Sequence, residues 1–504
     1  MRKWYVKGNG QNARSSEQLL LKNVIKKFIT FAMVLYVLCG NAPEVSAGFG
    51  NAVAADGVYL VDDHTVTVLI TAGKTEWSKA LGKDGSVEIY ALAPFENAVP
   101  KDRMPVAKVM LYAADWAQSS DTITKRATFV LPENGLYRKY AVGGKYGVNL
   151  QVKYICNPEL LATHTKERID YPAKLPEGMF ANYHIDLKQY SDSYVLGTAK
   201  IVQFNNYGTN PVLRHPLADA EDIHAPWEHD VDKQPFQYMM NASDPDGIAA
   251  MAKIMHEVAS NGPGQDYIIG NEVNVRKWCY ISYVDEEQYI REYMQVFRVA
   301  YNAIKSADAN ARVFICLDHD WNRDHPEGDW ERYCVIDSRD FLIRFNEMIR
   351  EEGNIGWGLA YHPHLAPLTN AKFWDNSEPY RSLIDEDRIV TVQNLSVVTD
   401  LLKQEEFLDA EGKVRSVMAT EVTYSANQGA DVQGAAVYAA YVSILRNPYV
   451  ETIVINQDPQ EDIDGIFTPM AQYVYDNMDG PAAYAYDVWA KQVIGITDWG
   501  QILR

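Results

Sequence analysis

The spacing of hydrophobic and polar residues divides the chain into two regions with different periods. Between residues 52 and 156, short runs alternate apolar and polar positions, and turn sequences such as Glu133-Asn134-Gly135 separate them. The predicted strands are 57–61, 65–70, 87–92, 106–110, 127–131 and 147–154. Many short alternating strands of this kind are typical of two packed antiparallel sheets, so residues 52–156 predict an all-β sandwich domain.

From residue 157 onward, apolar strands alternate with longer amphipathic helices. The predicted strands are 267–270, 312–317, 357–360, 417–419 and 452–455, and the predicted helices are 285–309, 338–352, 395–407, 432–446 and 481–493. Strands that are apolar on both faces and follow one another through helices indicate a buried parallel sheet. The fold class predicted for residues 157–504 is therefore α/β, a (β/α)8 TIM-type barrel.

The first half of this region carries a weaker pattern. Candidate strands lie at 179–184, 200–204 and 236–240, and one clear helix is expected over 245–259, with Ser243 as its N-cap. Three strand–helix units would complete a barrel of eight. Because apolar periodicity is thin here, a barrel abbreviated in its first half is the alternative.

The N-terminal residues 1–47 have the layout of a secretory signal peptide. A basic segment precedes an apolar run from Phe28 to Cys39, and Val45-Ser46-Ala47 offers small residues for cleavage. The apolar run is too short for a stable membrane span. We therefore expect a secreted or cell-surface protein, with lipoprotein anchoring at Cys39 as the alternative.

The net charge limits the kinds of partner that the chain can bind, and the cysteine count limits its disulfide bonds. The formal net charge is -20, and residues 1–47 carry seven basic and two acidic side chains, so the remainder is more acidic still. Such a chain is a poor match for nucleic acid or anionic membranes, which need basic patches. Four cysteines follow Cys39, too few for a disulfide framework, although one bridge between Cys279 and Cys334 is possible.

Two glutamates stand where the predicted parallel strands end. Glu272 follows Tyr267–Gly270, and Glu421 follows Val417–Thr420. Ligand sites of parallel α/β folds lie at the carboxyl ends of their strands, and cleavage of a glycosidic bond needs two carboxylates. The pair therefore predicts the two catalytic carboxylates, one of which, as the acid, is expected to have a raised pKa. Asn271, just before Glu272, is placed to bind a sugar hydroxyl.

A family resemblance rests on these motifs. Ile268-Ile269-Gly270-Asn271-Glu272 and Thr420-Glu421 resemble the strand-4 and strand-7 motifs of the clan A glycoside hydrolases. Together with Leu317–Asn322 and Gly358–His364, they resemble an uncharacterised bacterial domain-of-unknown-function family related to that clan. The resemblance implies a barrel with Glu272 as acid/base and Glu421 as nucleophile of a retaining enzyme, acting on a carbohydrate. It names no sugar.

Further polar and aromatic residues at the strand ends are candidates for substrate binding. They are Asn271, Asn274, Asp318, His319, Trp321, Asn322, Tyr361, His362, His364 and Gln457. We assign no metal ligands, and we expect no organic cofactor, because the chain has no glycine-rich phosphate loop.

Two other functions remain open from the sequence. His319, His362 and His364 could instead serve a metal-dependent hydrolase, since imidazoles are common metal ligands. Alternatively, the chain is a carbohydrate-binding barrel without turnover. The oligomeric state is left undetermined.

Overall fold

A computed structural model describes most of the chain after residue 53. Described are residues 54–504, apart from 63, 75–76, 78–80, 82, 112–116, 119–120, 145–146, 157, 159–179, 185–191, 196–200, 220–234, 262–264, 283, 324–335, 376 and 456–480. The predicted signal peptide, Cys39, Cys334 and Gln457 lie outside the described residues.

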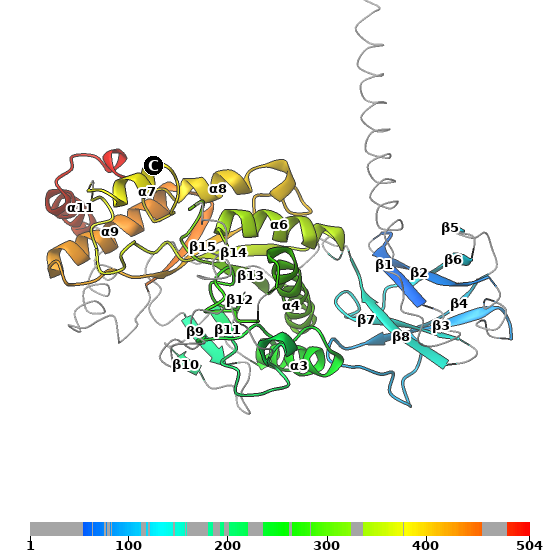
Figure 1. Ribbon diagram of the computed structural model, residues 1–504. Coiled ribbons are helices and arrows are strands. Elements are labelled where there is room, and N and C mark those ends of the chain that lie inside the picture. Colours follow the sequence, from blue (N-terminus) through cyan, green and yellow to red (C-terminus); the bar gives the residue numbers. More distant parts are fainter. Residues whose placement is uncertain are drawn as a thin grey trace, which may run out of the picture. The chain divides into compact units, whose positions relative to one another are not determined.

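The N-terminal part contains two antiparallel four-stranded sheets (Figure 1). One has the order β1-β2-β6-β5, from Ala54–Leu60, Thr65–Gly73, Thr122–Val130 and Ala117–Gln118. The other has the order β4-β3-β7-β8, from Ala107–Met110, Ser86–Leu92, Lys139–Gly144 and Gly147–Tyr154. Alternate residues of both sheets, such as Val68 and Ile89, are fully buried in one shared core. All six predicted strands are present, whereas the sequence pattern did not indicate β5 and β7.

The C-terminal part is an α/β fold built on one curled sheet of order β10-β9-β11-β12-β13-β14-β15-β16. Its strands, in that order, are Asp192–Val195, Phe180–His184, Ile201–Asn205, Asp266–Ile269, Arg312–Leu317, Trp357–Tyr361, Val417–Val422 and Val450–Ile455. Seven strands are parallel, and the edge strand β10 runs antiparallel to β9.

Parallel strands are confirmed by this sheet, but a closed ring of eight is not seen. Within the described residues no pairing joins β16 back to β9 or β10. The difference lies in the first half of the region, where the sequence pattern was weak. The predicted strand 236–240 makes only isolated bridges, through Tyr238 and Met240, because each residue finds a partner outside the sheet, Tyr280 and Arg214 respectively.

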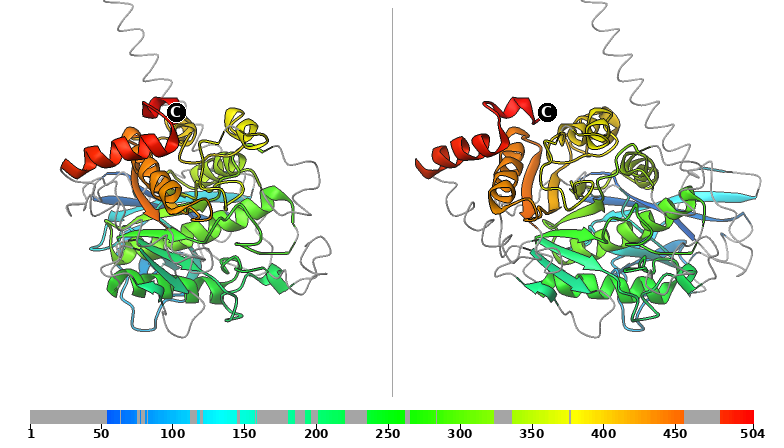
Figure 2. Two further views of the ribbon diagram at one scale, coloured as in Figure 1. Left: turned by 90° about the vertical axis from the view of Figure 1, so that its left-hand side faces the viewer. Right: turned by 60° about the vertical axis from the view of Figure 1, so that its left-hand side comes forward.

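The helices lie along the outer side of the parallel strands, where Figure 2 shows them in succession from α3 to α9. They are α3 (Pro245–Asn261), α4 (Glu286–Ala307), α6 (Ser338–Glu351), α7 (Tyr380–Asp385), α8 (Ser396–Leu402), α9 (Ala430–Arg446) and α11 (Pro481–Ile494). Short 3-10 turns occur at Pro216–Asp219, Glu405–Phe407 and Trp499–Gln501.

The helix starts follow from local capping chemistry. Asp285 caps α4 by accepting a hydrogen bond from the backbone N–H of Gln288. At α3 the cap is Asp244, whose carboxylate accepts from the N–H of Gly247, and the prediction of Ser243 is wrong. The reason is that Pro245 occupies the first helical position, so the residue directly before it takes the cap.

The two faces of the parallel sheet bury different residues. Six strands, β11 to β16, contribute side chains to an inner cluster, which consists of Ile201, Ile268, Phe314, Cys316, Ala360, Met418 and Val454. The intervening residues, such as Ile269 and Leu359, belong to the larger core shared with the helices. Gly358 completes the inner packing, because a Cβ there would lie 2.4 Å from the ring of Phe314. This strict alternation fixes which side chains reach the inner end of the sheet.

An ion-pair network ties the starts of four strands together. Arg312 donates to Asp266 from Nε at 2.5 Å and from a terminal nitrogen at 2.6 Å, and to Glu451 at 2.6 Å. Ser416 bridges the arginine and the glutamate. These residues begin β12, β13 and β16 or precede β15, so the network lies at the end of the sheet opposite Glu272 and Glu421.

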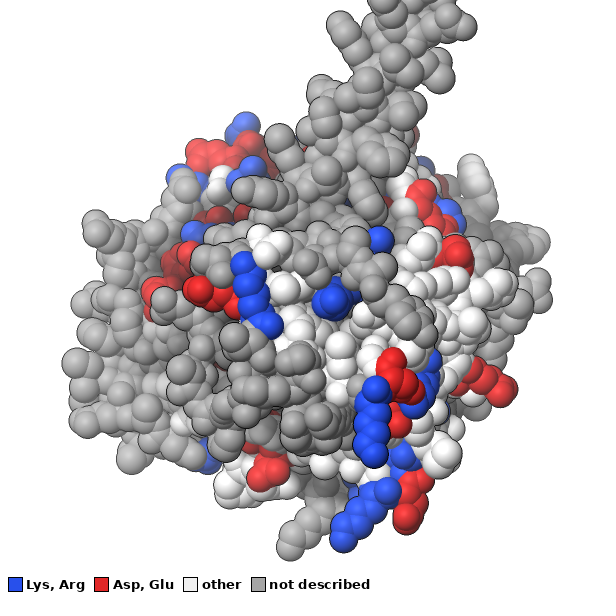
Figure 3. Space-filling model, turned by 90° about the vertical axis from the view of Figure 1, so that its right-hand side faces the viewer, with Lys and Arg blue, Asp and Glu red and all other residues white. Residues whose placement is uncertain are grey.

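Other features test the remaining sequence predictions. Cys156, Cys279 and Cys316 are free thiols, and Cys334, the other member of the possible bridge with Cys279, lies outside the described residues. Across the described residues, no helix combines the length and apolarity needed to span a bilayer. On the face drawn in Figure 3, the described Lys and Arg side chains lie interspersed with Asp and Glu rather than in one continuous patch.

Candidate active site

Two backbone turns place the carboxylates at the ends of their strands. Gly270 has φ +80°, and Glu272 and Glu421 have φ of 37° and 57°. The left-handed region is costly for a residue that carries a Cβ, and such outliers cluster at functional sites. Both glutamates therefore hold strained conformations at equivalent places, just after β12 and near the end of β15. Glu272 is 8% exposed, and the Glu421 side chain is 22% exposed.

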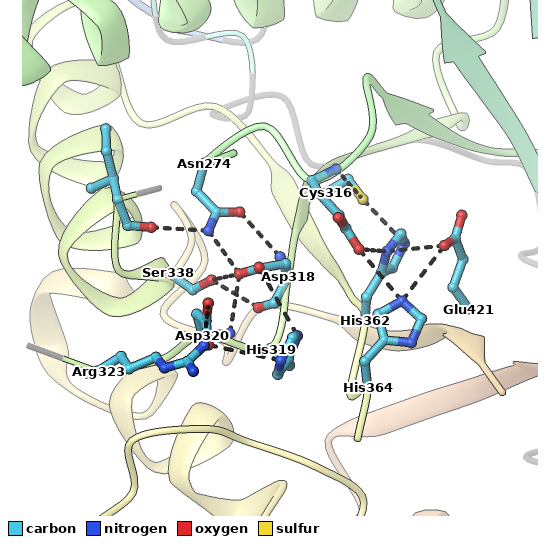
Figure 4. Close-up of polar contacts among 12 residues, drawn as sticks. Asn274, Cys316, Asp318, His319, Asp320, Arg323, Ser338, His362, His364 and Glu421 are labelled. Carbon is cyan, nitrogen blue, oxygen red and sulfur yellow. Dashed lines mark hydrogen bonds and ion pairs between the residues drawn. The ribbon is translucent and has the colours of Figure 1, made fainter. Parts of the chain in front are cut away.

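Two histidines from the end of β14 lie between the glutamates. His362 and His364 follow Gly358 and Ala360 of β14 at a spacing of two, and a tight turn at Pro363 joins them, in which the N–H of His364 donates to the carbonyl of His362 at 2.8 Å. His362 Nδ1 is 3.0 Å from Glu272 Oε1 and 3.4 Å from Glu421 Oε2. His364 Nε2 is 3.4 Å and 3.7 Å from the same two oxygens. Figure 4 shows both imidazoles directed toward Glu421.

Cys316 closes this group from inside the sheet. Its sulfur lies 3.2 Å from His362 Nε2 and accepts a hydrogen bond from the backbone N–H of Glu272 at 3.3 Å. Burial raises the pKa of the Cys316 thiol, so it remains protonated at neutral pH. The fully buried thiol therefore orients His362 and the Glu272 turn and is not itself a nucleophile.

The charges of the group are set by burial and by close pairing. Burial raises the pKa of Glu272, but the hydrogen bonds from His362 and His364 lower it more, so the net pKa falls below its usual range. This direction is opposite to the one expected from the sequence, because the two imidazoles were not foreseen as partners. Burial lowers the pKa of His364, yet its bonds to Glu272 and Glu421 raise it to about 9. The close carboxylates likewise raise the pKa of His362 against the effect of burial, so the pairing favours an ionised Glu272 beside protonated imidazoles.

Asn271 is held beside Glu272 by a residue from the neighbouring strand. Gln203 Nε2 donates to the side-chain oxygen Oδ1 of Asn271 at 2.9 Å and to the backbone oxygen of Gly270 at 3.0 Å. Because its oxygen is engaged, the Asn271 amide offers its nitrogen as the donor for a bound molecule. The sequence did not identify Gln203, although a glutamine within the apolar strand 201–205 was a visible signal.

A second polar cluster follows β13. Asp318 Oδ1 accepts from Asn274 Nδ2 at 2.8 Å, from the Ser338 hydroxyl at 3.1 Å and from the backbone N–H of Asp320 at 3.1 Å (Figure 4). Burial, followed by the charges of Asp320 and Glu272, raises the pKa of Asp318 well above its usual range. Asn274 and Asp318 thus have a local role, tying the loop after β12 to the start of α6.

His319 lies between the two clusters. Its ring centroid is 6.1 Å from that of His364, and its Nε2 is 3.7 Å from Asp320, which also binds Arg323. Burial lowers the pKa of His319 to about 4, so the imidazole is neutral at pH 7. The structure therefore separates His319 from the four-residue group of glutamates and histidines.

Three other residues predicted to bind substrate differ in how far their side chains are exposed to solvent. Trp321 and Tyr361 are both buried and pack edge to face at 6.1 Å, so neither presents an open ring to a sugar. Asn322 is exposed. The sequence did not indicate Ser338, which donates to Asp318, or Arg323, which pairs with Asp320.

Four residues combine to make a set that could hold a metal ion. Glu272, His362, His364 and Glu421 each offer one ligand atom, and these four atoms lie within 4.8 Å of one another. The two carboxylates of the group are equally suited to acid/base and nucleophilic chemistry.

Comparison with solved structures places several glycoside hydrolases among the similar proteins. A mannanase of Bacillus subtilis is 11% identical, with a TM-score of 0.24, over 51% of this chain and 60% of that chain. A β-glucosidase of Thermotoga maritima in complex with deoxynojirimycin is 11% identical, with a TM-score of 0.26, over 51% and 73% respectively. A β-glucuronidase of Bacteroides uniformis is 11% identical, with a TM-score of 0.26, over 80% and 45%. The chain thus spans less than two thirds of the mannanase.

Sequence comparison gives the family. No curated protein sequence matches the chain. A family model matches residues 174–502, a span that contains the whole parallel sheet and the four residues of the site. The chain therefore belongs to DUF5722, a family of unknown function.

Proposed function

We propose that the protein is a retaining glycoside hydrolase in which Glu272 is the acid/base and Glu421 the nucleophile. The observation that carries this proposal is the short distance between the two carboxylates at the ends of β12 and β15. One oxygen of each lies within 4.8 Å of the other. Retaining enzymes have carboxyl groups about 5–5.5 Å apart, whereas inverting enzymes leave about 6.5–9.5 Å for a water molecule. The separation favours direct attack by a carboxylate.

Each glutamate has one oxygen turned to the imidazoles. Both contacts of Glu272 are made through Oε1, and both contacts of Glu421 through Oε2. The remaining oxygens, Oε2 of Glu272 and Oε1 of Glu421, are the ones proposed to meet the substrate. The histidines then fix the orientation of both carboxylates, as second partners of catalytic groups generally do.

The reaction would proceed in two steps. In the first, a Glu421 oxygen bonds to the anomeric carbon while the glycosidic bond breaks and Glu272 gives a proton to the leaving oxygen. In the second, Glu272 takes a proton from water, whose oxygen replaces Glu421 at the same carbon. His362 and His364, which carry the protons next to Glu272 in the free protein, are the nearest source for the proton needed in the first step.

Substrate binding is proposed for the residues around this pair. Asn271, fixed by Gln203, would donate to a sugar hydroxyl. The acidic balance of the chain suits a neutral or cationic glycan better than an anionic one. We propose a carbohydrate substrate without assigning the sugar, the linkage or an internal or terminal cut.

Secretion and a supporting sandwich domain complete the proposal. Residues 1–47 would be removed as a signal peptide, which an N-terminal residue of Gly48 in secreted protein would verify. The two antiparallel sheets would form a sandwich that braces the barrel-like part. Supporting contacts are the ring packing of Phe95 on His256 at 5.2 Å and of Tyr137 on Tyr301 at 6.1 Å.

The test is a screen of aryl glycosides and polysaccharides with four proteins. Wild type and the control Glu405→Gln, an exposed glutamate on a 3-10 turn, are expected to release the same sugar with chelator present. Glu272→Gln and Glu421→Gln are expected to lower kcat by at least about 100-fold. Sugar binding without release by the wild type would instead identify a binding protein, and full activity of Glu421→Gln would overturn the mechanism.

A further inference from the structure

We propose that Glu272, His362, His364 and Glu421 form a binding site for a zinc ion, and that occupancy of this site blocks hydrolysis. Zinc binding is inferred from geometry alone, whereas its inhibitory effect rests on the proposed function. The site lies within the described residues, and its ligand atoms are Glu272 Oε1, His362 Nδ1, His364 Nε2 and Glu421 Oε2.

The spacing of the four atoms matches a tetrahedron around one ion. Zinc ligands at about 2.0–2.2 Å in tetrahedral arrangement lie about 3.3–3.6 Å from one another. The four nitrogen–oxygen distances in the site are 3.0, 3.4, 3.4 and 3.7 Å. One ligand atom of each of the four residues lies within 4.8 Å of the others. The four nitrogen–oxygen distances differ from the edges of a zinc tetrahedron by a few tenths of an ångström at most, so small movements along these edges suit a central ion.

The kinds of ligand atom select the ion. Two imidazole nitrogens and two carboxylate oxygens suit zinc, whereas calcium and magnesium prefer sites made of oxygen atoms alone. Two carboxylate ligands also balance the double positive charge of the ion, and binding of the ion releases the protons from the ligating nitrogens of His362 and His364. At a concentration of zinc that saturates the site, the same concentration of magnesium should therefore leave the site unoccupied.

The surroundings of the ligands support a bound ion. Metal-bound imidazoles use their second nitrogen to donate a hydrogen bond that fixes the ring, and His362 Nε2 has the Cys316 sulfur at 3.2 Å for this purpose. The strands hold three of the ligands almost fully buried, while the Glu421 side chain is 22% exposed. An ion can therefore enter from the Glu421 side of a largely preformed site.

Four protein ligands leave the ion no open position. A catalytic zinc keeps one position for water or substrate, whereas a complete protein tetrahedron is a closed site. Zinc would also occupy both carboxylates that the hydrolytic reaction needs. The ion is therefore expected to act as a reversible inhibitor and not as the catalyst.

The test is a calorimetric titration of the full chain with zinc chloride after treatment with chelator. Wild type and the control His64→Ala, a change at an exposed histidine of the β1–β2 turn, are expected to bind one equivalent. His364→Ala and Glu421→Gln are expected to bind at least about 100-fold more weakly, since loss of outer partners alone costs 10–100-fold. Unchanged one-to-one binding by these two variants, or no binding by wild type, would overturn the proposal.

A second measurement guards against variants that fail to fold. Cobalt(II) added to the wild-type protein should give the intense visible absorption of a four-coordinate ion, and zinc should abolish it in a one-to-one titration. A weak six-coordinate spectrum would contradict the tetrahedral site.

The two proposals fail separately. Zinc binding without any sugar release by the chelated protein would remove the proposed function and leave the ion site intact. Sugar release that zinc does not inhibit would remove the inhibitory site and leave the glycosidase. Activity that requires zinc would support the ion site and contradict the metal-independent mechanism.

Discussion

Glu272 and Glu421 both hold a backbone conformation that few residues with a side chain adopt. Their φ values of 37° and 57° place the carboxylates beside the imidazoles of His362 and His364 at a cost in stability. A left-handed conformation costs a residue that has a Cβ about 1–2 kcal/mol, whereas glycine adopts it freely. The backbone conformation at Glu272 and Glu421 is thus expected to lower the stability of the fold while it holds the two carboxylates in place.

Replacing Glu421 by glycine or alanine should reveal this cost. Both variants lose the carboxylate, but only alanine has a Cβ, which makes the left-handed backbone conformation costly. We expect Glu421→Gly to be more stable than Glu421→Ala by about 1 kcal/mol, in contrast to the usual order at regular positions. Urea unfolding of the two proteins measures the difference. Equal stabilities would show that the turn is not strained.

The role of Glu272 should depend on the leaving group. A leaving group of low pKa departs without a proton, so an acid catalyst contributes little to its release. We expect Glu272→Gln to lower kcat by about 10²–10⁴-fold for sugar leaving groups and far less for formation of the glycosyl-enzyme from dinitrophenyl glycosides. Pre-steady-state release of dinitrophenol measures that first step. An equal loss for both substrate types would assign Glu272 another role.

At the scale of elements, the strands were predictable where the sequence was apolar on both faces. The strand Arg312–Leu317 was predicted with its observed bounds, because its apolar run lies between two clear helical patterns and can only be a strand of this length. The strand expected at 236–240 was wrong because its backbone partners come from loops, which no periodicity shows. The two glutamates were found from their places after strands, but Gln203 and the Cys316–His362 contact depend on pairing between strands.

The Arg312 network at the strand starts should support the fold and not the reaction. Arg312→Met leaves the fully buried Asp266 without its cation, and removal of one partner of a buried pair costs about 3–5 kcal/mol. We expect the free energy of unfolding to fall by about 3 kcal/mol, the lower end of this range, because the arginine side chain is 17% exposed. Urea unfolding gives the value, and sugar release by the folded variant should match wild type.

Two comparisons make this prediction specific. The exposed pair of Arg381 and Asp385 on α7 is expected to contribute less than about 1 kcal/mol when Arg381→Met is made. A double change, Asp266→Leu with Arg312→Met, should recover part of the loss because no buried charge remains at Asp266. A double variant less stable than Arg312→Met alone would contradict the explanation.

At the scale of the molecule, the fold concentrates the chemistry at one end of the parallel sheet. The strand starts carry the Arg312 network, and the strand ends carry the glutamates, the histidines and Asn271. The sequence predicted an α/β part preceded by an all-β part because the hydrophobic period changes near residue 157. It could not predict that the curled sheet stays open among the described residues, because ring closure depends on pairing between the first and last strands.

The proposed mechanism requires that Glu421 forms a covalent bond to sugar. The most direct measurement is mass spectrometry of the protein after reaction with a panel of dinitrophenyl 2-deoxy-2-fluoroglycosides, whose fluorine slows the second step. We expect one added glycosyl group on the peptide that contains Glu421, absent from Glu421→Gln and present in Glu405→Gln. Hydrolysis of the parent glycosides with no adduct, or an adduct on another residue, would contradict it.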